Sequence, residues 1–213
     1  MIRAILFDMD GLLVDSEPVH AKNAIQALER QGVKISEKDF YAHWTRDGKT
    51  IHHFAKERAI PVDVPRYRQD KREAYPGLVK AHLKPMEGAA QKVRELAGHY
   101  KLALVSASTR EEVRIILEHV GLADAFEVVL SCDDVQNPKP APDAFLLAAE
   151  RLGVKPGECL VLEDAWKGVE AAAAAGMKAV AIPCDYTKDN DFSKADKVLS
   201  SLRKLTPEMI DKL

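Results

Sequence analysis

Short apolar runs alternate with longer amphipathic stretches along most of the chain. Apolar runs between turn residues are typical of buried strands, whereas apolar positions spaced three and four apart are typical of helices. The pattern predicts strands at 3–7, 101–105, 128–130, 159–162 and 178–182. It predicts helices at 17–31, 89–97, 111–120, 143–152 and 167–175. Strands and helices that alternate in this way favour an α/β fold, in which helices cover both faces of a doubly wound parallel sheet.

The segment 36–81 differs because it contains no convincing strand pattern. Helices are predicted to begin at 36–39, to continue at 49–58 and to run through 66–75. We expect the prolines of this segment to separate these helices from one another, since proline lacks the N–H that a helix interior needs. They are Pro61, Pro65 and Pro76. The sequence therefore predicts a core domain at 1–15 and 84–213, with a small all-helical domain inserted at 16–83.

Composition restricts the class of partner. The 213 residues are 46% hydrophobic and 30% charged, which is ordinary for a globular protein with a packed core. Lys and Arg total 31 against 33 Asp and Glu, so the net charge is −2. No overall field would hold a nucleic acid or an anionic membrane. Any charged ligand must therefore be held by a local cluster, and we expect a monomer whose partner is a small molecule.

The cysteines and the N-terminus indicate the compartment. Three cysteines, Cys132, Cys159 and Cys184, are widely separated and form no CxxC pair, which argues against a disulfide framework or a zinc site. Cys159 and Cys184 lie in apolar runs and are interpreted as buried apolar thiols. The apolar run 4–7 is too short for a signal peptide or a membrane span. We expect a soluble cytoplasmic protein.

Polar side chains follow four of the predicted strands at the point where each strand ends. These residues are Asp8 and Asp10, Ser106 and Ser108, Lys139 in the loop 138–140, and Glu163 with Asp164. Ligands of open α/β sheets bind outside the carboxyl ends of the strands. We therefore expect carboxylates, hydroxyls and one ammonium group to converge on one edge of the sheet.

The types of these residues predict phosphoryl transfer. Asp8 and Asp10 are two apart, so extended geometry places both carboxylates on one side, where they repel each other. A hard divalent cation such as Mg²⁺, held by Asp8, Asp164 and a backbone carbonyl, would relieve this repulsion and recruit a phosphate. Lys139 would neutralise further charge, and Ser106 would donate a hydrogen bond. The alternative, that Asp8 and Asp10 are only turn residues, is disfavoured because the other strand ends carry matching groups.

Four segments in this order resemble the motifs of a known family. The segments are 8–16 (DMDGLLVDS), 105–108 (VSAS), 137–143 (NPKPAPD) and 162–165 (LEDA). They resemble the four motifs of the haloacid dehalogenase-like (HAD) superfamily. The helical insertion is similar to the mobile cap of the subfamily that includes beta-phosphoglucomutase and small sugar phosphatases. The resemblance covers essentially the whole chain and implies a Rossmann-like core with an inserted all-helical cap.

The resemblance also implies roles for the residues of these motifs. Asp8 would attack phosphorus to form an aspartyl phosphate, and Asp10 would act as general acid and then general base. Mg²⁺ would be held by Asp8, Asp164 and the carbonyl of Asp10, with Glu163 either a further ligand or a neighbour of the ligands. The presence of Asp10 also argues against a dehalogenase, because dehalogenases proper lack an acidic residue at this position. The transferring phosphate would be bound by Ser106, Ala107, Ser108 and Lys139.

The acceptor of the phosphoryl group stays open between water and a sugar hydroxyl. His20, Arg46 and Lys71 in the insertion resemble the mutase branch, where cations would grip a distal phosphate. Arg46 and Lys71 are equally consistent with a solvated helix face, and the favoured alternative for His20 is a histidine on the helix surface or packed at a hinge. We favour a Mg²⁺-dependent phosphohydrolase that acts on a small phosphorylated metabolite, a sugar or nucleoside monophosphate. A beta-phosphoglucomutase-like mutase is the alternative, and a non-catalytic binding module is a remote one.

Overall fold

The computed structural model of the chain describes residues 1–46 and 49–213. They form two compact units. The first, the sheet unit, comprises Met1–Asp15 and Pro85–Leu213. The second, the helical unit, comprises Ser16–Lys84. Within the described residues, every helix is too short or too polar to cross a membrane.

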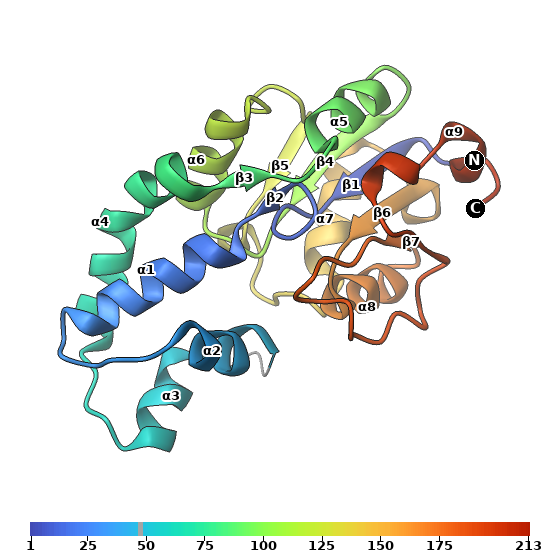
Figure 1. The fold of residues 1–213 in the computed structure, drawn as a ribbon. Helices are drawn as coiled ribbons and strands as arrows, with labels where there is room; N and C mark the ends of the chain where they lie inside the picture. The colour runs from blue at the N-terminus through green and yellow to red at the C-terminus, as the bar shows by residue number, and fades with distance from the viewer. Residues whose placement is uncertain (47–48) are drawn as a thin grey trace. The chain divides into compact units, whose positions relative to one another are not determined.

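The sheet unit is built on a six-stranded parallel sheet in the order β5-β4-β1-β6-β7-β8 (Figure 1). The strands are β1 (Ala4–Phe7), β4 (Lys101–Val105), β5 (Val128–Leu130), β6 (Cys159–Glu163), β7 (Lys178–Ala181) and β8 (Lys197–Val198). The predicted α/β class and the five predicted strands are confirmed. The edge strand β8 was not predicted, because it is only two residues long and both are exposed.

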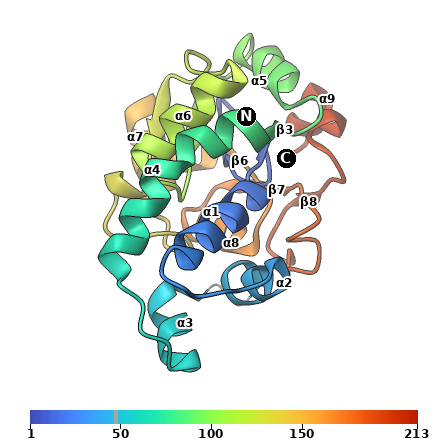
Figure 2. The same cartoon turned by 60° about the vertical axis from the view of Figure 1, so that its left-hand side comes forward.

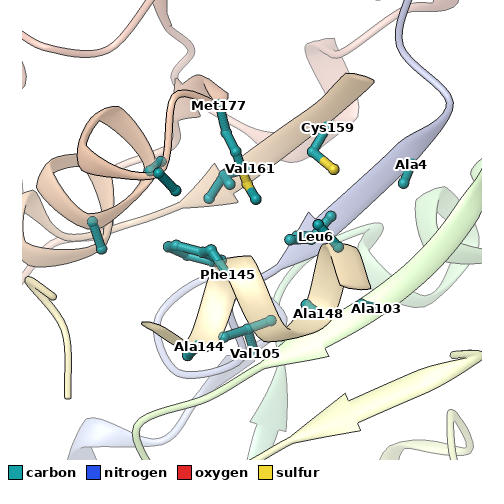
Figure 3. Packing of buried hydrophobic residues seen from close by; sticks show 14 of the residues in the cluster. Ala4, Leu6, Ala103, Val105, Ala144, Phe145, Ala148, Cys159, Val161 and Met177 are labelled. Carbon is teal, nitrogen blue, oxygen red and sulfur yellow. The ribbon is translucent and has the colours of Figure 1, made fainter. Parts of the chain in front are cut away.

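Helices cover both faces of this sheet. They are α5 (Ala89–Ala97), α6 (Arg110–Val120), α7 (Asp143–Leu152), α8 (Trp166–Ala174) and the short α9 (Pro207–Ile210). The fully buried ring of Phe145 on α7 packs against the sheet beside Leu6 and Val161 (Figure 3). Successive strand residues point to opposite faces, so Phe7 faces away from α7, and it too is fully buried. A strand that is apolar on both faces therefore forms the centre of the sheet.

Two short segments lie where the chain leaves and re-enters the sheet unit. Gly11 has a φ of +80°, a left-handed conformation that favours glycine, and its N–H donates to the carbonyl of Val14 at 2.8 Å. The turn directs the chain away from the end of β1. Beyond it, β2 (Val14–Asp15) and β3 (Lys84–Pro85) pair as a two-stranded sheet.

The helical unit contains α1 (Glu17–Glu29), α2 (Glu37–Phe40), a π-helical segment Tyr41–Arg46, α3 (Ile51–Arg58) and α4 (Val64–His82). Its elements between residues 36 and 81, as far as described, are all helical, as predicted. Helices α1 and α4 lie side by side (Figure 2), and the Asn23 side chain on α1 donates to the carbonyl of Lys71 on α4 at 3.1 Å.

Pro61 lies between α3 and α4 and Pro65 lies at the start of α4, as predicted, but the prediction that Pro76 separates helices is wrong. Pro65 lies in the first turn of α4, where its missing N–H would have no partner in any helix. Pro76 lies inside α4, which continues to His82. An interior proline disfavours a helix by about 3 kcal/mol. Beyond it, Leu78 and Val79 are buried, and this burial offsets the lost hydrogen bond.

Candidate active site

The central strand β1 ends at the point where the strand order of the sheet reverses. Phe7 is in register with Leu104 of β4 and Leu162 of β6. The next residue, Asp8, therefore lies between the carboxyl ends of two neighbouring strands. Ligands of doubly wound sheets bind at such a reversal, because the helices that follow the two strands lie on opposite faces and leave a crevice.

Lys139 reaches this crevice from the loop between β5 and α7. Its Nζ lies 2.6 Å from Oδ1 of Asp8 and 2.7 Å from Oε1 of Glu163, and it donates to the carbonyl of Val105 at 2.8 Å. The ammonium group has three hydrogens, and all three are used. Its side chain is 8% exposed, so water does not compete for these contacts. Lys139 thus joins the ends of β1, β4 and β6.

Three buried carboxylates gather around this lysine. Asp8, Glu163 and Asp164 each offer an oxygen, and these atoms lie within 4.8 Å of one another. Burial, reinforced by the charge of Glu163, raises the pKa of Asp8 to about 8. Burial likewise raises the pKa of Asp164 well above its usual range. Burial alone would lower the pKa of Lys139, but the charges of Asp8 and Glu163 raise it above its ordinary value.

These residues fit a hard divalent cation. Three ionised carboxylates and one ammonium group carry two surplus negative charges, and this surplus adds to burial in raising the pKa values of Asp8 and Asp164. A divalent cation would neutralise that surplus, and carboxylate oxygens are the ligands that Mg²⁺ prefers. The predicted grouping of Asp8, Asp164 and Lys139 at one sheet edge is therefore present in the structure.

The side chain of Glu163 is held by protein groups at both oxygens. Oε1 contacts Lys139, and Oε2 accepts from the backbone N–H of Ala165 at 3.2 Å. Gly168 on α8 makes room for it, since a Cβ there would lie 1.7 Å from Oε1. The sequence left open whether Glu163 binds a cation directly. In the structure, Glu163 contacts Lys139 and the backbone, and its role is therefore to pair with Lys139.

Asp10 is held by the end of β4. Its Oδ2 accepts from the hydroxyl of Ser108 at 2.8 Å and from that of Ser106 at 3.3 Å. The backbone N–H of Ser108 donates to Oγ of Ser106 at 3.0 Å, which fixes the loop that also contains Ala107. The two serines predicted to bind a phosphate therefore also orient the carboxylate of Asp10.

The predicted residues of the insertion lie in the helical unit. The ring of His20 stacks on that of Tyr75, with centroids 5.6 Å apart. The Nζ of Lys71 lies 5.7 Å from the centre of the Tyr67 ring. Arg46 ends the π-helical segment, and its side chain falls outside the described part of the chain.

Sequence reasoning missed two residues at this sheet edge. The thiol of Cys184 lies 3.3 Å from Oδ2 of Asp164, and the hydroxyl of Thr187 lies 3.2 Å from the same oxygen. Cys159 is fully buried, as predicted, but the interpretation of Cys184 as a buried apolar thiol is wrong, because Cys184 is partly exposed and bonded to a carboxylate. Both missed residues follow β7. The rule of reading the residues after each strand would have found them if it had been applied to that strand as well.

Comparison with known proteins gives consistent matches over the chain. The family described as haloacid dehalogenase-like hydrolase matches residues 2–176. Fructose-1-phosphate phosphatase YqaB of Escherichia coli (strain K12) is 33% identical over 180 residues, or 83% of this chain and 94% of that protein. Protein CbbY of Rhodobacter capsulatus is 30% identical over 224 residues, or 100% and 99%. Beta-phosphoglucomutase of Clostridium difficile superposes with a TM-score of 0.80 at 25% identity, covering 100% of this chain and 96% of that chain.

Proposed function

The chain belongs to the haloacid dehalogenase-like hydrolases, and from this membership we propose that it is a Mg²⁺-dependent phosphatase of a small organic phosphate. The substrate class is a sugar or nucleoside monophosphate, in keeping with its similarity to a fructose-1-phosphate phosphatase. The observation that carries the proposal is the buried contact of Lys139 with both Asp8 and Glu163, beside the carboxylate of Asp164. Such a cluster supports a carboxylate nucleophile acting on an anionic phosphorus centre.

Asp8 and Asp10 divide the reaction into two steps. In the first, a carboxylate oxygen of Asp8 bonds to phosphorus, the bond from phosphorus to the ester oxygen breaks, and Asp10 protonates the departing alkoxide. In the second, Asp10 takes a proton from water, the water oxygen bonds to phosphorus, and the bond to Asp8 breaks. Inorganic phosphate leaves, and both carboxylates return to their starting states.

The surrounding residues hold the nucleophile in position and neutralise the negative charge of the phosphate. Mg²⁺ would be held by Asp8, Asp164 and the carbonyl of Asp10, and when bound it supplies the positive charge that lets a carboxylate approach a phosphate. Lys139 holds Asp8 in place and offsets charge that develops on the phosphoryl oxygens. Glu163 holds Lys139.

Residues from two further parts of the chain complete the proposed site. At the end of β4, the hydroxyls of Ser106 and Ser108 orient Asp10. From the resemblance to the mutase branch, the candidates for substrate recognition in the helical unit are His20, Arg46 and Lys71.

A substrate panel tests the proposed activity. Purified protein with Mg²⁺ is expected to release inorganic phosphate from at least one sugar or nucleoside monophosphate, measured colorimetrically. Asp8→Asn should reduce that release by at least about 1,000-fold, because an amide cannot act as the nucleophile. Asp124→Asn is the matched control, since Asp124 is an exposed aspartate of the same unit. Phosphate release retained in Asp8→Asn would exclude Asp8 as the nucleophile.

A phosphosugar mutase is the second candidate, favoured by the structural similarity to beta-phosphoglucomutase. The same first step would then be followed by attack of a sugar hydroxyl instead of water. The discriminating assay supplies beta-glucose 1-phosphate primed with glucose 1,6-bisphosphate. Formation of glucose 6-phosphate with no phosphate release from any member of the panel would replace the phosphatase assignment by the mutase.

A further inference from the structure

The loop after β7 meets the acidic cluster at one atom, Oδ2 of Asp164. The hydroxyl of Thr187 lies 3.2 Å from this oxygen and the thiol of Cys184 lies 3.3 Å from it. Neither residue belongs to the four sequence motifs. Their contacts converge on a carboxylate that the proposed function assigns to the cation.

The loop is built so that its donors point at this oxygen. The hydroxyl of Thr187 accepts the backbone N–H of Cys184 at 3.1 Å and donates to Oδ2 of Asp164, and it also lies 3.4 Å from the sulfur of Cys184. The N–H groups of Thr187 and Lys188 both donate to the carbonyl of Cys184, at 3.1 and 3.0 Å, and close the turn. These bonds hold the two donors at a constant separation.

A second hydrogen bond joins the same two loops, and the turn after β1 packs closely against the carboxylate. Oδ1 of Asn190 accepts the N–H of Trp166 at 3.2 Å, two residues beyond Asp164. A Cβ at Gly11 would lie 2.2 Å from Oδ2 of Asp164 and 3.3 Å from the sulfur of Cys184, so the turn after β1 packs against the same oxygen and the same thiol. Within residues 1–46 and 49–213, its Oδ1 accepts no hydrogen bond.

We propose that Cys184 and Thr187 are positioning residues, which hold Oδ2 of Asp164 so that the carboxylate presents Oδ1 to a divalent cation. The terminal torsion of an aspartate is broad, and an unrestrained carboxylate would rotate away from a ligand geometry. Hydrogen bonds from neighbouring side chains to ligating carboxylates set their orientation, and losing such bonds typically weakens metal binding 10- to 100-fold. The inference rests on the proposed function, since it takes Asp164 as a cation ligand.

Titration of the metal-free protein with MgCl₂ in a calorimeter tests the proposal directly. Thr187→Val keeps the shape of the side chain but removes its donor, and it should raise the dissociation constant for Mg²⁺ about 10-fold. Thr187→Ser keeps the hydroxyl and should stay within about threefold of the wild type. Cys184→Ala should weaken binding less than Thr187→Val, because a thiol is a weak donor. Cys132→Ser is the control, as Cys132 is a partly exposed cysteine of the same unit and should leave binding unchanged.

Activity gives a second readout. For Thr187→Val, the Mg²⁺ concentration at half-maximal rate should rise, whereas KM for the phosphate ester at saturating Mg²⁺ should stay within twofold, because a positioning role acts on the cation and not on the ester. A merely structural role would lower the melting temperature and leave the dissociation constant unchanged.

Three results would overturn the proposal: no calorimetric Mg²⁺ binding by the wild type, Mg²⁺ binding by Thr187→Val within twofold of the wild type, or Thr187→Ser as weak as Thr187→Val. The outcome is separable from that of the proposed function. Mg²⁺ binding that depends on Thr187, in a protein that releases no phosphate from any substrate, would support the positioning role and remove the phosphatase assignment.

Discussion

The ionisation of Asp8 is controlled first by its burial and then by the charges of its neighbours. Its carboxylate is buried, contacts the ammonium of Lys139 and lies beside the carboxylates of Glu163 and Asp164. One ammonium group does not balance three carboxylates, so the pKa of Asp8 rises to about 8, with burial as the larger cause and Glu163 as the next. In the absence of a cation the folded protein therefore retains a proton that the unfolded chain would lose.

This proton makes the stability of the metal-free protein depend on pH. Between pH 4 and 8 the unfolded Asp8 is ionised and the folded Asp8 is protonated, so the folded state binds more protons and its stability falls as the pH rises. Asp8→Asn removes this dependence. In the presence of a chelator, we compare the free energy of unfolding of Asp8→Asn with that of the wild type. The difference, variant minus wild type, should increase by about 1–4 kcal/mol from pH 5 to pH 8, because one pKa unit equals about 1.4 kcal/mol. Urea unfolding at the two pH values measures the change.

Asp124→Asn serves as the control for that experiment, because Asp124 is exposed. It should show the same pH dependence as the wild type. If Asp8→Asn also follows the wild type from pH 5 to 8, the carboxyl of Asp8 is ionised in the metal-free protein.

Helix α8 contributes to the cluster through a residue that has no side chain. Gly168 lies in the first turn of α8, directly against the carboxylate at the end of β6, where a Cβ would be 1.7 Å from Oε1 of Glu163. Glu163 is 2% exposed, and its two oxygens are held by Lys139 and Ala165. The close approach of this helix to the strand end is what keeps Glu163 turned toward Lys139.

Gly168→Ala should therefore disturb the site by displacing the side chain of Glu163. The added methyl group requires Glu163 to move, which breaks its contact with Lys139 and leaves buried polar groups without partners. We expect a loss of about 1–3 kcal/mol in the free energy of unfolding and a fall in kcat of at least about 10-fold. Thermal unfolding and steady-state kinetics measure the two effects.

Gly157→Ala is the matched substitution for comparison. Gly157 lies in the same unit, and a Cβ there would meet nothing within 4 Å. Both its stability and its kcat should stay close to those of the wild type. A Gly168→Ala protein as active as Gly157→Ala would mean that Glu163 need not contact Lys139.

The chain as a whole is almost neutral, with a net charge of −2. The sheet nevertheless concentrates buried acids at one edge, since Asp8, Glu163 and Asp164 all follow or end parallel strands beside the strand-order reversal. The charges of the whole chain nearly cancel, whereas the buried charges at this edge of the sheet do not. The global stability of the protein should depend on whether a cation occupies that edge.

Mg²⁺ should accordingly raise the melting temperature of the whole protein. At a concentration 100 times its dissociation constant, a ligand that binds only the folded state stabilises it by about 2.7 kcal/mol, or roughly 5–10 °C for a chain of this size. The rise should be larger at pH 8 than at pH 5, because the ligating carboxylates must be deprotonated. Differential scanning calorimetry with and without a chelator measures it. Asp164→Asn should abolish most of the rise, and an equal rise with NaCl at the same ionic strength would contradict a specific site.

The apolar pattern was enough to predict the class of the fold and the edge of the sheet that carries the site. Buried strands need unbroken apolar runs, and parallel strands place their carboxyl ends together. Asp8, Asp10, Ser106 and Lys139 could therefore be grouped from their positions after strands. Strand β8 lacked such a run, and the continuation of α4 through Pro76 depended on burial beyond the proline that local propensity does not contain.

The amino-acid sequence by itself thus determined which residue types meet at one edge of a parallel sheet, because that follows from the order of apolar runs and the polar residues after them. The partner of each polar side chain was decided by the folded structure. Glu163 faces Lys139 because α8 brings Gly168 against it, and Asp164 is bonded by Cys184 and Thr187 because a turn places two donors at one oxygen. Such contacts depend on distances of a few ångströms between segments far apart in the chain, and only the packing of the complete sheet and its helices sets those distances.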